Sequence, residues 1–399
     1  MMTDALDILG TDPRPPFFAV DNAAELGLEP PEDRIGLPVR TWVRALAGMQ
    51  KEAIVLNGAT GSCWRLVSDE GPYLAGHDRA PCPLCIYITG MVSSYMSEII
   101  ALADRRGLAF SDIELTLGNH YSMEGSALKG TMLGGAQTPE LKATIVADAD
   151  ISDLEDLVRQ AITASPINGL LQDVNNSLFN LSWNGRQIRV GDVESLNTEM
   201  LPDPAEEFDR VRVAESHVAD DLMLKVKPAE AMEGVPGGAN TSLQESQSRT
   251  LHVQARCRRR GDGLKVIHEN LIRPMGSEFR FISDESPGFG GSGRAPDALT
   301  YLAAGIGFCF MTQFGRYASI TRKQLDEYRI VQDTHFSPGG QGGAGKAHPV
   351  ETHVYLVTPE GEEFARKVLD MGERTCFLHA TCRTDLDVDL IVGRAASVG

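Results

Sequence analysis

The chain of 399 residues carries one stretch of sequence twice, 215 residues apart. Residues 65–94 and residues 280–309 are identical at eleven of thirty aligned positions, and the alignment needs no gap. The same offset pairs Arg44 with Arg259. Solenoid proteins repeat a unit of about 20 to 50 residues. The period in this chain is much longer, so it predicts two copies of one whole domain.

Composition along the chain divides it into four segments. Residues 1–35 contain five prolines and are predicted to form an N-terminal arm. The first copy is expected over residues 36–194 and the second over residues 245–399. Between them, residues 195–244 are polar and rich in Pro, Gly and Glu, which is typical of a linker.

Both copies show the same order of expected elements. Alternating apolar and polar residues predict short antiparallel strands, and a Gly- and Pro-rich turn then leads into a long apolar helix, at 83–106 and at 297–320. A capping box at Ser152 and a Thr-Pro pair at Thr358 predict where a shorter, amphipathic helix begins in each copy. Strands grouped before and after helices, with few strand–helix–strand units, indicate the α+β class.

The overall composition limits the classes of partner. A net charge of −18 and a pI near 4.9 argue against nucleic acid, since such binding depends on Lys and Arg neutralising phosphates. We expect no membrane partner because no run of eighteen apolar residues occurs, and no signal peptide because the N-terminus is acidic. Seven cysteines in such a chain are predicted to be reduced thiols of a cytoplasmic protein.

Cys309 is the first candidate for chemistry, because the repeat places Ser94 at the equivalent position of the first copy. It lies well inside its expected helix, on the face that carries Arg316. At about 1.5 Å per residue it is about 18 Å from the helix N-terminus, which is too far for the helix dipole to lower its pKa. A reactive Cys309 would therefore need a cationic neighbour, and without one it is a buried structural cysteine.

Cys376 is the second candidate. It follows the shorter helix of the second copy, whereas the corresponding position in the first copy holds Ser165. Both candidate thiols are thus present in one copy and replaced by serine in the other. This pattern fits an attacking thiol and a resolving thiol.

With these residues the chain resembles the superfamily of osmotically inducible protein C and the organic hydroperoxide resistance proteins (OsmC/Ohr). Members of that family have a Gly-Gly turn, a Pro-containing helix start, an Ala- and Gly-rich helix with a cysteine, and a second Cys-containing segment before the last strand. The resemblance covers both copies, over 36–194 and 245–395. The matching features of the second copy are Gly290-Gly291, Pro296, LAAGIGFCF around Cys309, and CFLHATCRTDLDV from Cys376.

The resemblance implies the family's architecture, in which two chains form an intertwined homodimer with sites at the subunit interface. Each domain would be a curved antiparallel sheet with two helices. Two fused copies would then form an intramolecular pseudo-dimer. Such a chain could exist as a monomer or as a homodimer.

The resemblance also implies thiol-dependent reduction of organic hydroperoxides, a peroxiredoxin-like role in the oxidative stress response. Carried over, Cys309 attacks the peroxide oxygen and becomes a sulfenic acid, Cys376 condenses with it to a disulfide, and an external dithiol reduces that disulfide. No cofactor is expected for this reaction. The family holds its thiolate with an Arg from an early hairpin, for which the candidates are Arg259 with its neighbours at 258–260, or Arg44 from the first copy.

Two further features leave other functions open. The family often places a Glu near the start of the cysteine helix, where this chain has Cys85 and Thr300. Cys82 and Cys85 form a CPLC motif, which fits a redox pair, two structural cysteines, or half of a zinc or other metal site completed by His120, His335 or the thiols of the second copy. These features favour a different cysteine- or metal-dependent enzyme acting on a small organic substrate. A non-catalytic binding protein is the third class, since fold does not fix function.

Overall fold

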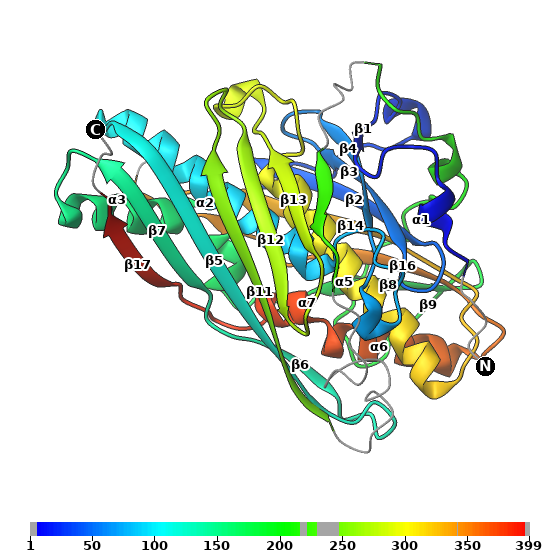
Figure 1. The fold of residues 1–399 in the computed structure, drawn as a ribbon. Coiled ribbons are helices and arrows are strands. Elements are labelled where there is room, and N and C mark those ends of the chain that lie inside the picture. Colours follow the sequence, from blue (N-terminus) through cyan, green and yellow to red (C-terminus); the bar gives the residue numbers. More distant parts are fainter. Residues whose placement is uncertain (1–5, 216–221, 230–246, 341, 396–399) are drawn as a thin grey trace.

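The protein consists of two large sheets with the two long helices, α2 (Pro83–Arg106) and α5 (Ala298–Thr321), packed between them (Figure 1). Helix α2 contacts the second sheet, α5 contacts the first, and the two helices contact each other. This arrangement confirms the predicted α+β class. The computed structural model describes residues 6–215, 222–229, 247–340 and 342–395.

The first sheet has nine strands in the order β1-β4-β3-β2-β14-β16-β8-β9, and β15 pairs with β14. Its pairs are antiparallel except for β16 with β8, which is parallel. The strands are β1 (Phe18–Ala19), β2 (Leu37–Ala45), β3 (Lys51–Asn57), β4 (Cys63–Ser68), β8 (Leu178–Trp183), β9 (Arg186–Ile188), β14 (Glu327–Ser337), β15 (Lys346–Ala347) and β16 (Glu351–Val357).

The second sheet has eight strands in the order β10-β13-β12-β11-β5-β7-β17, and β6 pairs with β5. Its pairs are antiparallel except for β17 with β7. The strands are β5 (Phe110–Gly125), β6 (Leu133–Ala136), β7 (Glu140–Ala147), β10 (Met223–Lys227), β11 (Gln247–Arg259), β12 (Lys265–Arg273), β13 (Glu278–Ser283) and β17 (Asp389–Arg394).

Each sheet combines strands from both halves of the chain. In the first sheet β2 pairs with β14, and in the second sheet β11 pairs with β5 (Figure 1). The smaller helices lie around this framework. They are α1 (Ile8–Thr11), α3 (Ile151–Ala164), α4 (Asn168–Leu171), α6 (Glu362–Thr375) and α7 (Phe377–Cys382), together with the 3-10 turns at Ala24–Leu26, Pro72–Leu74, Glu207–Arg210 and Pro287–Phe289.

The two long helices lie where the sequence predicts them. Helix α2 spans the predicted residues 83–106, and α5 begins and ends one residue later than the predicted 297–320. By length and composition alone both helices could cross a membrane, but 78% and 94% of their most apolar windows are buried inside the protein. Their apolar composition is thus explained by their place between two sheets.

The starts of the two shorter helices differ from the prediction. The N-cap residue of α3 is Asp150, two residues before the expected Ser152. The N-cap residue of α6 is Gly361, three residues after the expected Thr358. The Thr358 hydroxyl donates to the carbonyl of Gln324 and accepts from the backbone N–H of Glu360, ahead of the helix. The capping patterns therefore predicted both helices but placed their first residues two or three positions away.

The predicted arm and linker both contribute strands. Within the arm, β1 pairs with β4 at the edge of the first sheet. Within the linker, β10 pairs with β13 at the edge of the second sheet. Residues 1–5 of the arm and residues 216–221 and 230–244 of the linker lie outside the described residues.

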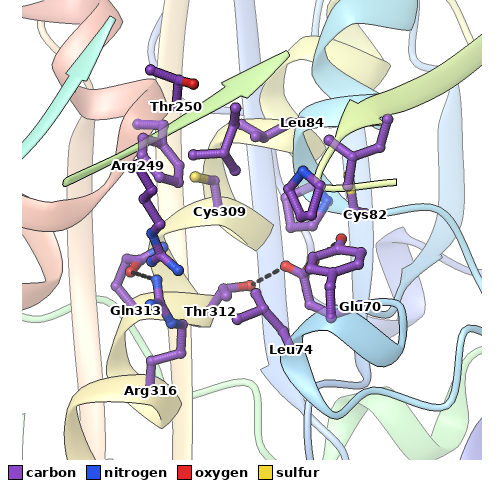
Figure 2. A pocket seen from close by; sticks show the side chains of 16 residues that line it. Glu70, Leu74, Cys82, Leu84, Arg249, Thr250, Cys309, Thr312, Gln313 and Arg316 are labelled. Carbon is purple, nitrogen blue, oxygen red and sulfur yellow. Dashed lines mark hydrogen bonds between the residues drawn. The ribbon is translucent and has the colours of Figure 1, made fainter. Parts of the chain in front are cut away.

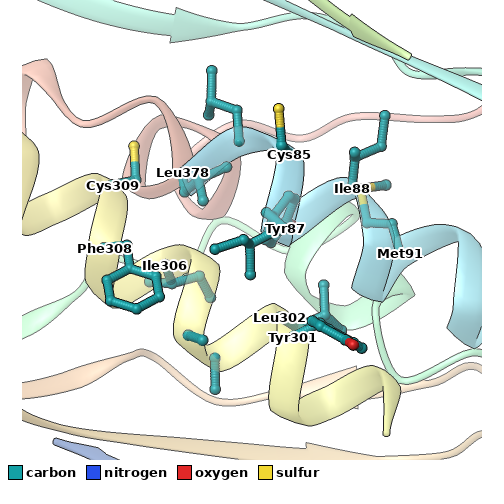
Figure 3. Close-up of a cluster of buried hydrophobic side chains, with 14 of the residues drawn as sticks. Cys85, Tyr87, Ile88, Met91, Tyr301, Leu302, Ile306, Phe308, Cys309 and Leu378 are labelled. Atoms are coloured by element: carbon teal, nitrogen blue, oxygen red, sulfur yellow. The ribbon is translucent and has the colours of Figure 1, made fainter. Parts of the chain in front are cut away.

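Two glycines allow α2 and α5 to approach closely at their crossing (Figure 3). A Cβ atom at Gly305 would lie 2.7 Å from the Cβ of Tyr87 and 2.8 Å from its backbone. A Cβ atom at Gly90 would lie 2.7 Å from the carbonyl oxygen of Ala298. Gly90 and Gly305 are equivalent in the repeat, so both copies use the same position for the same close contact.

We expect Gly305→Ala to lower the free energy of unfolding by about 2 kcal/mol, because the added methyl group forces two packed backbones apart. This net loss already includes a gain of about 1 kcal/mol in helix propensity. Urea unfolding followed by circular dichroism measures it. Gly261→Ala is the control, since a Cβ there meets nothing within 4 Å. Equal effects of the two substitutions would contradict the close helix crossing.

Candidate functional site

Cys309 lines a cavity of about 40 Å³ beside the N-terminus of α2, which we name the thiol cavity (Figure 2). Since one water molecule needs about 10–15 Å³ on this measure, the cavity has room for two or three waters or one small head group. Its walls come from the segment before α2, from α2, from β11 and the end of β12, and from α5. The lining residues are Glu70, Tyr73, Leu74, Cys82, Pro83, Leu84, Arg249, Thr250, Leu251, Leu271, Pro274, Cys309, Thr312, Gln313, Arg316 and Phe377.

The structure brings Cys309 and Cys376 together. Cys376 is close enough to Cys309 to raise the pKa of its thiol, and the exposed fractions of the two side chains are 2% and 0%. Both are free thiols. Cys309 lines the thiol cavity and Cys376 does not, so Cys309 is the member of the pair that a small molecule would meet.

The electrostatic surroundings of Cys309 act in opposite directions. Burial raises the pKa of the Cys309 thiol well above its usual range, and the contact with Cys376 raises it further. The backbone N–H groups of Leu378 and Phe377 are near enough to the sulfur to lower its pKa. These N–H groups belong to the first turn of α7, for which Cys376 is the N-cap residue. The N-terminus of α7 therefore supplies N–H groups that lower the pKa of Cys309, whereas the N-terminus of α5 is too far away to do so.

Three buried charged side chains lie near Cys309. Glu70 and Arg316 line the thiol cavity, and Lys51 interacts with the thiol without lining the cavity. Burial raises the pKa of Glu70, and it lowers the pKa of Lys51 and of Arg316. Negative charge on Glu70 and on Cys309 raises the pKa of both cations again. Glu70 also accepts a hydrogen bond from the Thr312 hydroxyl at 3.5 Å. The positive charges of Lys51 and Arg316 would thus stabilise a thiolate at Cys309.

Arg249, on β11, is a second guanidinium at the thiol cavity, beside Arg316 (Figure 2). Burial and then the charge of Arg316 lower the pKa of Arg249 to about 8, against the opposite effect of Glu70. Arg316 donates a hydrogen bond to Gln313 Oε1 at 3.1 Å. Two neighbouring guanidinium groups favour an anion, or an oxygen that becomes negative during a reaction.

The two arginines that the sequence proposes as partners of Cys309 do not line the thiol cavity. Arg44 donates hydrogen bonds of 2.6 Å to Glu52 and to Asp209. Arg259 lies at the exposed end of β11. Ten residues separate it from Arg249, which is about 33 Å at about 3.3 Å per strand residue. The arginine that β11 contributes to the cavity is therefore Arg249, at the opposite end of the strand from Arg259.

A second cavity, of about 100 Å³, has walls equivalent to those of the first, and we name it the serine cavity. Ser94 lines it, and the hydroxyl oxygens of Ser94 and Ser165 are 2.7 Å apart. This serine pair stands where the repeat predicts the counterpart of the thiol pair. Nine lining residues of the serine cavity lie 215 positions from lining residues of the thiol cavity, namely Ser94 with Cys309, Ser97 with Thr312, Glu98 with Gln313, Ala101 with Arg316, Glu285 with Glu70, Phe289 with Leu74, Asp297 with Cys82, Ala298 with Pro83, and Leu299 with Leu84.

The four residues that the sequence suggests for a metal site do not form one group. The sulfur atoms of Cys82 and Cys85 are 2.9 Å from each other, and Cys82 lines the thiol cavity. His120 and His335 lie on β5 and β14, in different sheets, and the ring of His120 stacks on His252 at 4.1 Å between centroids. Within the described ranges, no group of three or more His, Cys, Asp or Glu side chains is arranged to hold a metal ion.

The sequence alone does not single out Glu70, Lys51 or Arg249 as site residues. Glu70 carries a signal, because it is one of the eleven identical positions of the repeat and is equivalent to Glu285. Lys51 is the first residue of β3 and Arg249 lies within β11, and no sequence motif marks either residue. Tertiary packing alone brings Arg249 to the cavity and Lys51 near Cys309.

Comparison with known proteins finds a family match over one part of the chain. Residues 290–391 match the family model described as OsmC-like protein. The matched region is similar to an OsmC-like domain. It contains α5, α6 and α7, and with them both Cys309 and Cys376. The mixed α+β architecture with two mainly antiparallel sheets is compatible with an OsmC-like fold.

Among solved structures, the chain is similar to an OsmC-like hydroperoxide resistance protein from Jannaschia sp. CCS1. The identity is 18%, the similarity covers 32% of this chain and 81% of that chain, and the TM-score is 0.19. No curated protein matches the chain.

Proposed function

We propose that this chain is a thiol peroxidase, which reduces small organic hydroperoxides through Cys309 and Cys376. The observation that carries the proposal is the position of Cys309, which faces a small cavity with Arg249 and Arg316 and contacts a second thiol. The OsmC-like domain at residues 290–391 supports a peroxide-related role. All seven cysteines are free, which suits a reducing compartment such as the cytoplasm.

We further infer that the chain is a pseudo-dimer of two OsmC-like copies, at residues 36–194 and 245–399, with an arm at 1–35 and a linker at 195–244. The pairing of β2 with β14 and of β11 with β5 supports this inference, because strands of the two halves complete each other's sheets. The constant offset between the walls of the two cavities supports it as well. The thiol cavity would then be the active site, and the serine cavity its inactive counterpart.

The reaction proceeds in two balanced steps. The Cys309 thiolate attacks the outer oxygen of the hydroperoxide, the O–O bond breaks, and Cys309 becomes a sulfenic acid. The alkoxide that leaves takes up the former thiol proton and departs as an alcohol. The Cys376 thiol then condenses with the sulfenic acid, which forms a disulfide and releases water. An external dithiol returns both cysteines to the thiol state.

The cations at the cavity would serve both charged species of the first step. Lys51 and Arg316 favour the Cys309 thiolate over the buried thiol. Arg249 and Arg316 line the space where the alkoxide oxygen develops its charge, and preorganised donors there lower the barrier. The cavity admits the peroxide group but little more, so the organic part of the substrate would extend toward Thr250, which is exposed.

We expect Cys309→Ser to lower the rate of hydroperoxide consumption by about a thousandfold or more, which corresponds to about 4 kcal/mol of barrier. Ser94→Ala is the matched control at the equivalent position, and its rate should stay within about twofold of the unmodified chain, a barrier change below about 0.5 kcal/mol. The measurement is peroxide loss, with peptide mapping of the cysteines. In Cys376→Ser, dimedone present during the reaction should label Cys309 as the sulfenic acid.

Two outcomes would overturn this function. A large loss of rate in Ser94→Ala would show that the serine cavity takes part in the chemistry. If Cys309 stays reduced under hydroperoxide while the purified protein contains stoichiometric zinc, the metal-dependent alternative would replace the peroxidase. Elemental analysis of the same preparation decides that point.

A further inference from the structure

The CPLC motif forms a second pair of thiols at the thiol cavity. Cys82 is the N-cap residue of α2 and Cys85 lies one turn later, and their sulfur atoms are 2.9 Å apart. Their exposed fractions are 7% and 2%. Cys82 lines the cavity together with Cys309 (Figure 2). The peroxidase reaction described above uses neither of these cysteines.

The distribution of cysteines over the repeat links the two pairs. At the 215-residue offset, Asp297 replaces Cys82, Thr300 replaces Cys85 and Ser94 replaces Cys309. Ser165, whose hydroxyl contacts that of Ser94, takes the place of Cys376. Asp297 lines the serine cavity, and its carboxylate accepts hydrogen bonds from the backbone of Thr300 and the side chain of Asn57. One member of each thiol pair, Cys82 and Cys309, therefore lines the thiol cavity, and their counterparts Asp297 and Ser94 line the serine cavity. If Cys82 and Cys85 were only structural, we would not expect them to occur at the same site as the other thiol pair and to be replaced at the equivalent site.

A buried carboxyl group accompanies the CPLC pair. Glu269 lies on β12 with an exposed fraction of 1%, and within the described residues neither of its oxygens has a hydrogen bond of ordinary geometry to another N or O group. The side chain that acts on it directly is the thiol of Cys85. A buried, otherwise unsatisfied carboxyl beside a thiol is positioned to accept that thiol's proton.

We propose that the Cys82–Cys85 dithiol reduces the Cys309–Cys376 disulfide within the chain, and that Glu269 accepts the proton of Cys85. This relay rests on the proposed peroxidase function and extends it. It makes the CPLC pair the place where reducing equivalents enter the site. The external dithiol would then reduce a Cys82–Cys85 disulfide.

The geometry sets the order of the two exchange steps. Since Cys309 faces the cavity and Cys376 does not, the Cys82 thiolate attacks the sulfur of Cys309. The Cys309–Cys376 bond breaks, and Cys376 leaves as a thiolate and takes the proton that Cys82 released. The result is a mixed disulfide between Cys82 and Cys309.

In the second step Cys85 passes its proton to Glu269, and its sulfur attacks Cys82. The Cys82–Cys309 bond breaks, and Cys309 leaves as a thiolate that takes the proton from Glu269. Two electrons have then moved from the CPLC dithiol to the Cys309–Cys376 pair. Burial raises the pKa of both thiols of the CPLC pair. The side chain and the backbone N–H of Cys85 lower the pKa of Cys82 in part, whereas the side chain of Cys82 raises the pKa of Cys85 further. This difference favours Cys82 as the first attacker.

The relay changes how much hydroperoxide the protein can reduce without any external reductant. The fully reduced chain should consume two equivalents of cumene hydroperoxide, because both dithiols are oxidised in turn. Cys82→Ser and Cys85→Ser should each consume one. Peptide mapping should find a Cys309–Cys376 disulfide in Cys82→Ser and a Cys82–Cys309 disulfide in Cys85→Ser. Cys63→Ser, a buried cysteine outside both pairs, is the control and should still consume two equivalents.

The outcomes separate the relay from the function on which it rests. If the unmodified chain consumes one equivalent and keeps Cys82 and Cys85 reduced, the relay is wrong and the peroxidase stands. If it consumes none, both are wrong. If Cys309→Ser still forms a Cys82–Cys85 disulfide under peroxide, the CPLC pair reacts directly and the proposed order is overturned. Glu269→Gln should keep two equivalents and slow the second by about a hundredfold at pH 7, and an unchanged rate would remove Glu269 from the relay.

Discussion

Residues 245–399 expressed without the rest of the chain are expected to aggregate or to form a homodimer, and not to fold as a stable monomer. In this fragment β11 lacks its partner β5, and β14 lacks its partner β2. Two strand edges would become unpaired, and such edges pair with other chains. Helix α5 would also lose α2, which exposes an apolar face on a helix that is almost entirely buried.

Size-exclusion chromatography with light scattering measures the outcome for this fragment. A homodimer is an informative result, because the fragment would then supply to itself the contacts that the first half normally provides. Co-expression of residues 1–229 with residues 245–399 is the matched control and should yield a soluble heterodimer. A monomeric fragment with a cooperative urea transition would contradict the pseudo-dimer.

The two long helices could be predicted from the sequence because their apolar runs are long and end in clear signals. The Arg105-Arg106-Gly107 stop places the end of α2 correctly, and Gly107 has the left-handed conformation that such a stop requires. The exchange of strands between halves could not be predicted, because an alternating pattern shows that a strand exists and does not name its neighbour. The family resemblance, and not the pattern, pointed to intertwined copies.

The pair of neighbouring thiols could be predicted better than its surroundings. Comparing the two copies singles out Cys309 and Cys376, because the first copy has a serine at the position equivalent to each. The spacing along the helix already placed Arg316 on the face of Cys309, but Arg249 could not be found in this way, because it reaches the thiol cavity from the far end of the strand that carries Arg259. The same holds for the N-terminus of α7 at Cys309, which depends on how distant segments pack.

Glu269 offers the second large effect, on stability as a function of pH. Burial raises the pKa of Glu269 from its ordinary value of 4.5 to about 8, the thiol of Cys85 lowers it in part, and Glu278 adds a small rise. Between these two pH values the folded chain holds a proton that the unfolded chain has lost. The contribution of Glu269 to stability is therefore complete below about pH 4.5 and declines as the pH rises toward 8.

We expect the unmodified chain to lose on the order of 4 kcal/mol more stability than Glu269→Gln between pH 5 and pH 8, because Gln cannot ionise. Urea unfolding at several pH values measures the two slopes. Glu124→Gln, an exposed position on β5, should keep the slope of the unmodified chain. Equal slopes for Glu269→Gln and the unmodified chain would show that Glu269 does not hold a proton in the folded state. Since the ionised fraction of Glu269 also limits how often it can accept the proton of Cys85, the relay rate should rise over the same pH range in which stability falls.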